Sequence, residues 1–325
     1  MTSTIKHLNT GKFLQTLQII VSAAALLYVG YKIVDFCNWN SFFITIKENQ
    51  RAFILFILLQ ILLSALNISI EAIKWKQLTS ILRPFRFYES LRQVLWGVRM
   101  GMITPIRVGE PVGKALLLGS GSRTAGFVLS LAGSVLQNCV IGIAGAAALV
   151  VLGRSRLSNS AWLNLLIDNM THYVPIIVAI VIVLTIGCWL FWQVLRKTPH
   201  WKQMGEHIRV VRKLGIKRII GIFGLTAARY ALFSFQMWLV LRFFGVAEVV
   251  EVIFLIPVYY LFVTFIPSLA LLDIGIRGSV ALFVFGWLSS DVAAIVTSAF
   301  TVWILNIALP SLVGIVFLKP KNSRI

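Results

Sequence analysis

Cysteine, histidine and acidic residues are scarce in this chain of 325 residues, which contains 3 cysteines, 4 histidines and 11 Asp and Glu residues. Cys37, Cys139 and Cys188 are widely spaced, with no CxxC pair and no histidine cluster nearby, so we interpret them as structural thiols. The histidines and acids are scattered without the spacing of metal ligands. The sequence therefore predicts no metal site and no cofactor.

A nucleotide-binding loop is also absent from the sequence. The glycine-rich segment GSGSRTAG at 119–126 lacks the lysine and hydroxyl of a phosphate-binding loop, so we interpret it as a connector. No other segment has an ATP-binding motif, and no pair of acids has catalytic metal spacing. The sequence thus predicts no ATPase and no catalytic residue, which disfavours an enzyme.

Apolar residues dominate what is present. The chain is 58% hydrophobic with a mean hydropathy of +0.89, more than a soluble domain keeps in solution. Several apolar runs reach the roughly 20 residues that cross a hydrocarbon layer of about 30 Å, and the alternation of a β-barrel is missing. These patterns predict an all-α fold, a polytopic helical membrane bundle formed by one domain over residues 1–325.

Lysine and arginine number 30, which gives a formal net charge of +19. Nucleic acid is a poor explanation for this charge, because the basic residues flank apolar spans and lack base-stacking modules. Cytoplasmic loops of membrane proteins collect Lys and Arg, and anionic head groups attract them. The expected partners are therefore membrane phospholipids and not nucleic acid.

Seven apolar runs are predicted to span the membrane. The first resembles a signal peptide, but its length and the many spans downstream favour a retained helix. If segment 275–288 also crosses, the count rises from seven to eight, and we favour the even count, which places the C-terminus in the cytoplasm. The seven predicted spans are 13–34, 52–73, 125–152, 174–195, 219–244, 252–270 and 292–318.

Charge asymmetry predicts the orientation of the chain. Loop 196–218 holds eight Lys and Arg residues against the single acid Glu206, so the positive-inside rule places it in the cytoplasm. The amino terminus is then cytoplasmic as well. Lys74, Lys76, Arg83 and Arg86 mark a further basic side after the second span. We predict a multi-pass membrane protein.

One stretch, RMGMITPIRVGEPVGKALLLG at 99–119, is unlike an ordinary membrane helix. Its prolines remove backbone donors and its glycines loosen the helix, which hydrocarbon tolerates only where protein or water satisfies the backbone. The segment FIPSLALLDIGIRGSVALFVFG at 265–286 reads as a second copy, with charges on either side of a glycine in both. Such paired interruptions indicate a transport site near the bilayer midplane. We predict two re-entrant or broken-helix hairpins, at about 89–119 and 265–289, related by a weak internal repeat.

These residues resemble the family of lysylphosphatidylglycerol synthase transmembrane regions, which is also described as flippase-like. ITPIRVGEPVGKALLL resembles the Pro-x-x-x-Gly-Glu hairpin of that family, DIGIRGSVALFVFG resembles its late Gly-x-x-Glu segment, and the resemblance covers nearly the whole chain. It implies a bacterial inner-membrane protein related to the domain of multiple peptide resistance factor proteins that moves aminoacylated phosphatidylglycerol between leaflets.

Two departures from the family limit what is carried over. Ile276 and Arg277 stand where the family commonly has an acid after the glycine pair. The soluble aminoacyl-transferase domain of full-length relatives is not expected after the last span, so synthase activity is not carried over.

Charged residues in or beside the spans are the candidates for binding a lipid head group, because a charge near the middle of a span costs roughly 2.5 to 3.5 kcal/mol on insertion scales. Arginine suits phosphate, and a carboxylate suits an amine. Two structural interpretations remain open: Arg229 pairs with an acid such as Glu251 or Asp273, and Arg107 pairs with Glu110. The candidates are Arg99, Arg107, Glu110, Arg229, Asp273 and Arg277.

Uncharged polar residues in the spans, and Glu71 with them, are predicted mainly to form interhelical hydrogen bonds. The residues concerned are Asn67, Glu71, Gln137, Asn138, Gln236 and Asn306.

The leading hypothesis is a lipid translocator that moves a phospholipid or an aminoacylated phosphatidylglycerol-type head group between leaflets. One alternative is a membrane-embedded glycosyl or aminoacyl transferase that uses a lipid-phosphate donor, with Glu110 or Asp273 as base. Another is a non-catalytic partner of a separately encoded lipid synthase.

Overall fold

The computed structural model describes residues 27–32, 34, 47, 50–104, 107–154, 214–246, 252–266 and 273–316. Every regular element in these ranges is a helix, which confirms the predicted all-α class. The predicted spans 13–34 and 174–195, most of loop 196–218, Cys37, Cys188 and Glu251 lie wholly or largely outside the described residues.

Four helices of the described chain are long and apolar enough to cross a membrane. They are α3 (Gln50–Thr79), α6 (Arg123–Arg154), α9 (Ile216–Phe243) and the continuous helix formed by α12 (Val292–Trp303), the π-helical turn η3 (Ile304–Ala308) and α13 (Leu309–Val316). They coincide with the predicted spans 52–73, 125–152, 219–244 and 292–318. Their length and composition indicate a membrane protein.

Shorter helices follow each of two long ones. After α3 come α4 (Phe87–Ile103) and α5 (Gly109–Leu116), and after α9 come α10 (Val252–Phe265) and α11 (Asp273–Phe285). α10 has 14 residues, which is about 21 Å at 1.5 Å per residue and shorter than a hydrocarbon core. The predicted span 252–270 is therefore not a long helix in the residues described.

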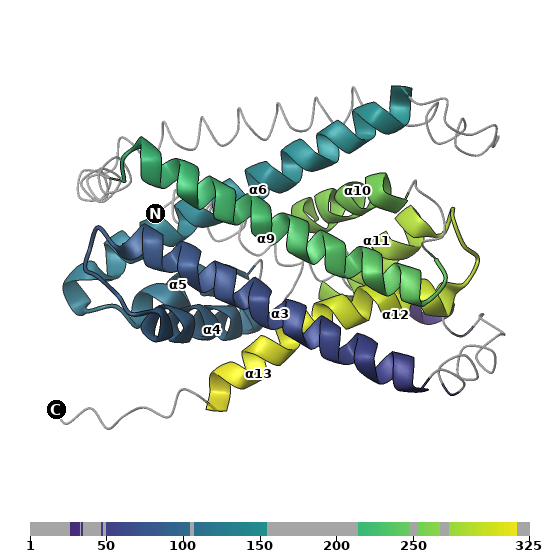
Figure 1. Ribbon diagram of the computed structural model, residues 1–325, viewed down its shortest axis with the longest axis horizontal. Helices are drawn as coiled ribbons and strands as arrows, with labels where there is room; N and C mark the ends of the chain where they lie inside the picture. The colour runs from purple at the N-terminus through teal and green to yellow at the C-terminus, as the bar shows by residue number, and fades with distance from the viewer. Residues whose placement is uncertain are drawn as a thin grey trace, which may run out of the picture.

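The helical contacts repeat between the first and second halves of the chain. In each half the two short helices contact one another, α4 with α5 and α10 with α11, and the second contacts the long helix that follows, α5 with α6 and α11 with α12. The first short helix contacts the closing helix of the other half, α4 with α13 and α10 with α6. α3 and α9 cross side by side in opposite directions (Figure 1).

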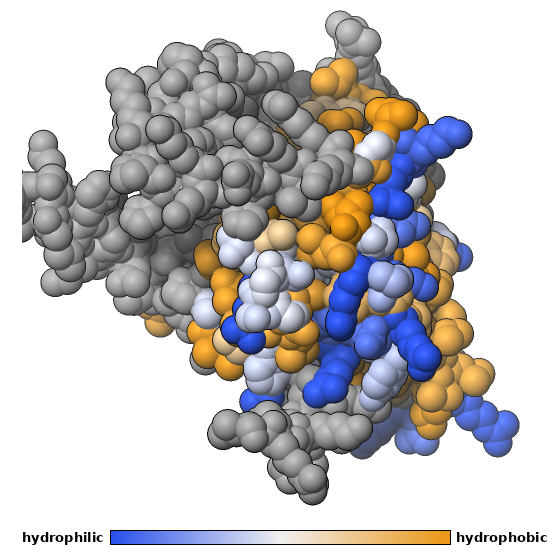
Figure 2. All heavy atoms as spheres, turned by 90° about the vertical axis from the view of Figure 1, so that its left-hand side faces the viewer, coloured by the Kyte–Doolittle hydropathy of each residue, from blue (hydrophilic) through white to orange (hydrophobic). Residues whose placement is uncertain are grey.

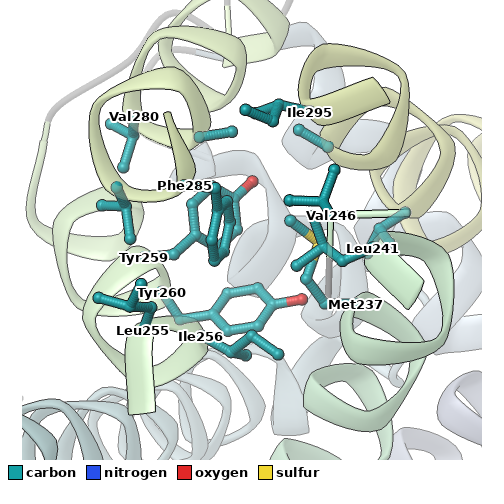
Figure 3. Packing of buried hydrophobic residues seen from close by; sticks show 14 of the residues in the cluster. Met237, Leu241, Val246, Leu255, Ile256, Tyr259, Tyr260, Val280, Phe285 and Ile295 are labelled. Carbon is teal, nitrogen blue, oxygen red and sulfur yellow. The ribbon is translucent and has the colours of Figure 1, made fainter. Parts of the chain in front are cut away.

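Two hydrophobic clusters hold these helices together. One gathers side chains of α9, α10, α11 and α12, and Figure 3 shows Tyr259 beside Phe285 at its centre, with ring centroids 5.5 Å apart. The other joins the end of α3 to α4, α6 and α9 around Trp75 and Leu129. Burying a large apolar side chain stabilises the fold by about 1.5–3 kcal/mol, so both clusters are strong anchors.

Hydrophilic side chains gather at the end of the molecule where α3 ends and α9 begins (Figures 1 and 2). The exposed basic residues of this end include Lys76, Arg83, Arg86, Lys217 and Arg218. Lys74, which the sequence groups with them, is instead buried against Glu71. The reason is that Lys74 lies on the inward face of α3. Lys76, two residues later, lies on the opposite, outward face of the same helix.

Candidate functional site

Glu71 on α3 is the centre of a buried charged network. Its Oε1 accepts a hydrogen bond from Lys114 Nζ of α5 at 2.8 Å. Its Oε2 lies 2.6 Å from Lys74 Nζ of α3 and 2.9 Å from Arg229 Nη1 of α9. Only 5% of the Glu71 side chain is exposed, so three cations stabilise one buried carboxylate. The network thereby joins α3, α5 and α9.

The break between α4 and α5 contributes the next two members of the network. Glu110, in the first turn of α5, lies 3.1 Å from Lys114 Nζ and 3.0 Å from Arg107 Nη2. The predicted pairing of Arg107 with Glu110 is confirmed. It is not a closed pair, because Lys114 connects Glu110 to Glu71.

Arg229 is connected to more than one helix. Its Nε donates to Asn67 Oδ1 at 3.0 Å, and its Nη1 reaches Glu71 on the same helix α3 and Gln137 Oε1 on α6, the latter at 3.5 Å. Among the described residues, the acid that pairs with Arg229 is therefore Glu71, and not Asp273, one of the two candidates that the sequence offers. Glu251 lies outside the described residues, and Asp273 pairs with Arg277.

Uncharged polar side chains continue the network between the long helices. Asn67 donates to Asn306 Oδ1 at 2.5 Å, and Asn306 donates to Gln236 Oε1 at 3.1 Å. Gln236 in turn donates to Gln60 Oε1 at 3.4 Å. The predicted interhelical hydrogen bonding is confirmed for Asn67, Gln236 and Asn306. Because the chain of bonds joins α3, η3 and α9, it fixes the crossing of the long helices.

Glycines position the short helices so closely that their charged side chains reach α3. A Cβ at Gly109 would lie 2.3 Å from Met100 O, and one at Gly97 would lie 2.9 Å from Glu110 O. Gly97 and Gly101 on α4, and Gly109 and Gly113 on α5, form two GxxxG patterns of the kind that lets membrane helices approach. From sequence, the glycines of 99–119 are expected only to loosen the helix, whereas Gly101, Gly109 and Gly113 lie in the contact surface between α4 and α5.

The backbone between α4 and α5 is strained at Arg107. Its φ is 55°, in the left-handed region that a non-glycine residue occupies at a cost of roughly 1–2 kcal/mol. Thr104 supports the turn, because its hydroxyl donates to Met100 O at 3.0 Å and accepts from Gly109 N at 2.7 Å. This local geometry holds Arg107 beside Glu110. Strained residues of this kind are concentrated at functional sites.

The charges of the network do not balance. Among the described residues, four cations, Lys74, Lys114, Arg107 and Arg229, meet two carboxylates, Glu71 and Glu110, which leaves a formal excess of two positive charges. The two lysines and Glu71 are at most 5% exposed.

The accessible part of the network consists of two arginines and one glutamate, and not of the buried lysines and Glu71. Arg107 is 33%, Arg229 20% and Glu110 19% exposed. Beside them, Arg107 Nε and Gln137 Nε2 are buried donors for which the described part of the chain supplies no hydrogen-bond partner. A surplus of positive charge and of donors can accept an anion such as a phosphate group.

The remaining predicted site residues lie apart from this network. Asp273 and Arg277 on α11 form an ion pair of 2.7 Å, and Trp303 Nε1 of α12 donates to the same Asp273 oxygen at 3.2 Å. Arg99 lies over the ring of Trp96, with its Cζ 5.0 Å from the ring centroid. The structure thus brings Arg107, Glu110 and Arg229 together and leaves Asp273, Arg277 and Arg99 outside their chain of contacts.

Sequence reasoning misses Lys74 and Lys114 as members of the site and assigns Glu71 only interhelical hydrogen bonding. A local signal is present, because Glu71 and Lys74 are three residues apart and Glu110 and Lys114 are four apart, spacings at which opposite charges pair on a helix. The contact between the two pairs is not local, because 43 residues separate Lys114 from Glu71.

Within the described ranges, no three His, Cys, Asp or Glu side chains are grouped so as to hold a metal ion. Comparison of the chain with protein-family models, curated proteins and solved structures finds no match.

Proposed function

We propose that this protein is a lipid translocator of the bacterial inner membrane, which moves a phospholipid or an aminoacylated phosphatidylglycerol-type lipid between leaflets. The observation that carries the proposal is the partly exposed network around Glu71, which in the described ranges has two positive charges in excess and donors on Arg107 and Gln137 without a partner. The resemblance of ITPIRVGEPVGKALLL to flippase-like transmembrane regions points to the same class of function.

The chemistry of a phospholipid head group fits the accessible members of the network. The guanidinium groups of Arg107 and Arg229 can each donate paired hydrogen bonds to phosphate oxygens. Glu110 supplies a carboxylate for the amine of an aminoacylated head group. The lipid phosphate would offset part of the positive excess, which reduces the cost of holding these charges in a membrane.

The arrangement of the helices supports a transport role. We infer that α4 and α5 form one re-entrant hairpin and that α10 and α11 form a second, because each pair of short helices sits between long ones and repeats the same contacts. The opposite directions of α3 and α9 support an inverted relation between the two halves (Figure 1). In transporters, broken helices in inverted repeats meet at the substrate site. Asp273 lies in the first turn of the second short helix of the second half, as Glu110 does in that of the first.

The basic end of the molecule, with Lys76, Arg83, Arg86, Lys217 and Arg218, is proposed to face the cytoplasm. The hairpin of α4 and α5 then enters from the cytoplasmic side. Glu71 lies eight residues before the end of α3, which corresponds to about 12 Å of helix. A head group at the network would therefore be below the cytoplasmic head-group layer and on a path into the bilayer.

Leaflet exchange in vesicles tests the proposed function. The purified protein is reconstituted, and the exchange of fluorescent phosphatidylglycerol and lysyl-phosphatidylglycerol is followed by quenching of the outer leaflet. We expect exchange well above that of protein-free vesicles, and a loss of at least tenfold in Arg229→Ala, because one charge-assisted hydrogen bond is worth about 1.5–3 kcal/mol. Lys217→Ala, which removes an exposed charge from the same helix, is the matched control.

Exchange no faster than in protein-free vesicles would refute the proposal. Equal rates in the wild type and Arg229→Ala would remove Arg229 from the site. Mass spectrometry of the lipids after the assay separates translocation, which leaves their mass unchanged, from a transferase reaction with an added sugar donor. A dependence of exchange on a copurifying synthase would support the partner interpretation instead.

A further inference from the structure

A groove of about 310 Å³ lies between α3, α4 and α13. Most of its walls are aliphatic. Ile61 and Tyr88, 41% and 58% exposed, are at its rim, so the groove opens on the outer surface of the bundle. The main lining residues are Ile61, Ala65, Ile68, Leu91, Leu95 and Val313.

The serines in the walls of the groove have their own partners. Ser64 Oγ donates to Leu305 O, and Ser69 Oγ donates to Ala65 O at 2.8 Å. Their donor hydrogens are therefore engaged by backbone carbonyls. The wall formed by α3 therefore has no free hydroxyl donor in the described structure, and the remaining charged donor is on α4.

Arg92 is the charged residue of the groove. Its side chain is half-buried, its Nε is buried without a hydrogen-bond partner, and it forms no ion pair with a carboxylate in the described part of the chain. Arg92 is the sixth residue of α4, and α4 begins next to Arg83 and Arg86 of the basic end. A charge with an unpartnered donor in an apolar wall is costly, and an anion there would reduce this cost.

We propose that the groove binds one anionic phospholipid from the surrounding bilayer. An acyl chain lies along Ile61, Ala65 and Val313, and the phosphate oxygens accept hydrogen bonds from Arg92. Charge complementarity selects this occupant, because a zwitterionic lipid would leave a positive amine beside the same guanidinium. The bound lipid connects α4 to α3 and α13. The site is separate from the Glu71 network, so it does not depend on transport.

Native mass spectrometry of the full chain in detergent tests this site. The protein is equilibrated with phosphatidylglycerol and phosphatidylcholine of identical acyl chains, and the retained lipid is counted. We expect the wild type to retain phosphatidylglycerol preferentially and Arg92→Gln to lose roughly tenfold in affinity for it, as expected for one charge-assisted bond. Lys76→Gln, which removes an exposed charge from the same end, should bind as the wild type does.

Ala65→Phe provides a second test because it fills the apolar part of the groove and leaves every charge in place. It should lower retention of phosphatidylglycerol severalfold. All variants are also prepared with Arg107→Ala, so that a lipid held by the Glu71 network is not counted.

Equal retention of both lipids by the wild type would overturn the proposal. So would undiminished phosphatidylglycerol binding in Arg92→Gln, or an equal loss in Lys76→Gln. If Arg92→Gln does not fold, the lipid preference of the wild type and the effect of Ala65→Phe decide the outcome.

Discussion

Arg229 on α9 donates a hydrogen bond to Glu71 on α3 at 2.9 Å, although 158 residues of chain separate the two. This contact closes the charged network between the first and second halves of the protein. Glu71 also holds Lys114 of the first short-helix pair, so one carboxylate connects the strained turn at Arg107 to the crossing of α3 and α9.

Glu71→Gln is expected to destabilise the protein by about 3–5 kcal/mol, because it leaves the buried cations Lys74 and Lys114 without their shared carboxylate. Thermal or denaturant unfolding in detergent measures the change. Glu89→Gln is the control, since Glu89 is exposed at the start of α4 and glutamine can keep its capping bond to Arg86 N. Equal stability of the two variants would mean that the network contributes little to the fold.

Gly109→Ala is expected to separate α4 from α5 and to lower stability by about 1–3 kcal/mol, the usual cost of overpacking. The added Cβ would lie 2.3 Å from Met100 O, a backbone atom that cannot move aside alone. Gly121→Ala is the comparison, because no atom lies within 4 Å of a Cβ at that position. The prediction fails if both variants unfold at the same temperature.

Arg107→Gly should separate stability from function. Glycine adopts the φ of 55° without strain, so this variant should be more stable than Arg107→Ala by about 1 kcal/mol. Both variants lack the guanidinium and should exchange lipid equally slowly in the vesicle assay. If Arg107→Gly exchanges lipid at the wild-type rate, the head group does not bind Arg107. Equal unfolding temperatures of the two variants would show that the left-handed turn carries no strain.

Cysteine labelling tests the orientation. Single cysteines at Ser120, beside the start of α6, and at Ser290, just before α12, are introduced into a chain whose native cysteines Cys37, Cys139 and Cys188 are replaced by serine. Both serines are exposed, and the start of α6 and the start of α12 lie at opposite ends of the molecule (Figure 1). A membrane-impermeant maleimide should label the cysteine at 290 in intact spheroplasts and the one at 120 only after lysis, because basic ends face the cytoplasm. Labelling of both from the same side would contradict the proposed orientation.

Local patterns anticipate a good part of the fold. The apolar runs predict α3, α6, α9 and the helix from α12 to α13, because the length of an apolar segment can be counted directly along the sequence. Proline and glycine between 99 and 119 predict an interrupted segment, and the break does fall between α4 and α5. The pairing of Arg107 with Glu110 follows from a spacing of three residues on one turn.

Long-range pairing is where the local patterns fail. Glu71 reads as one polar residue in a span, and nothing beside it in sequence indicates that Lys114 and Arg229 are its partners. Lys74 reads as part of a basic flank, and only the rotation of α3 shows that it faces inward. Asp273 is a plausible acid for Arg229 by sequence, yet Arg277 is closer along α11 and pairs with it.

The sequence by itself determines that this is an all-helical protein with membrane-length spans, interrupted by a charged, glycine-rich segment. These features follow from the sequence because a segment in hydrocarbon must be a long apolar helix, in which all backbone groups are hydrogen-bonded. Only the tertiary structure decides which charges meet. The glycines of α4 and α5 bring Lys114 and Glu110 within reach of Glu71, and the antiparallel crossing of α3 and α9 adds Arg229 from the other half of the chain. Coulombic attraction between buried charges acts through space, and therefore depends on packing that no local pattern specifies.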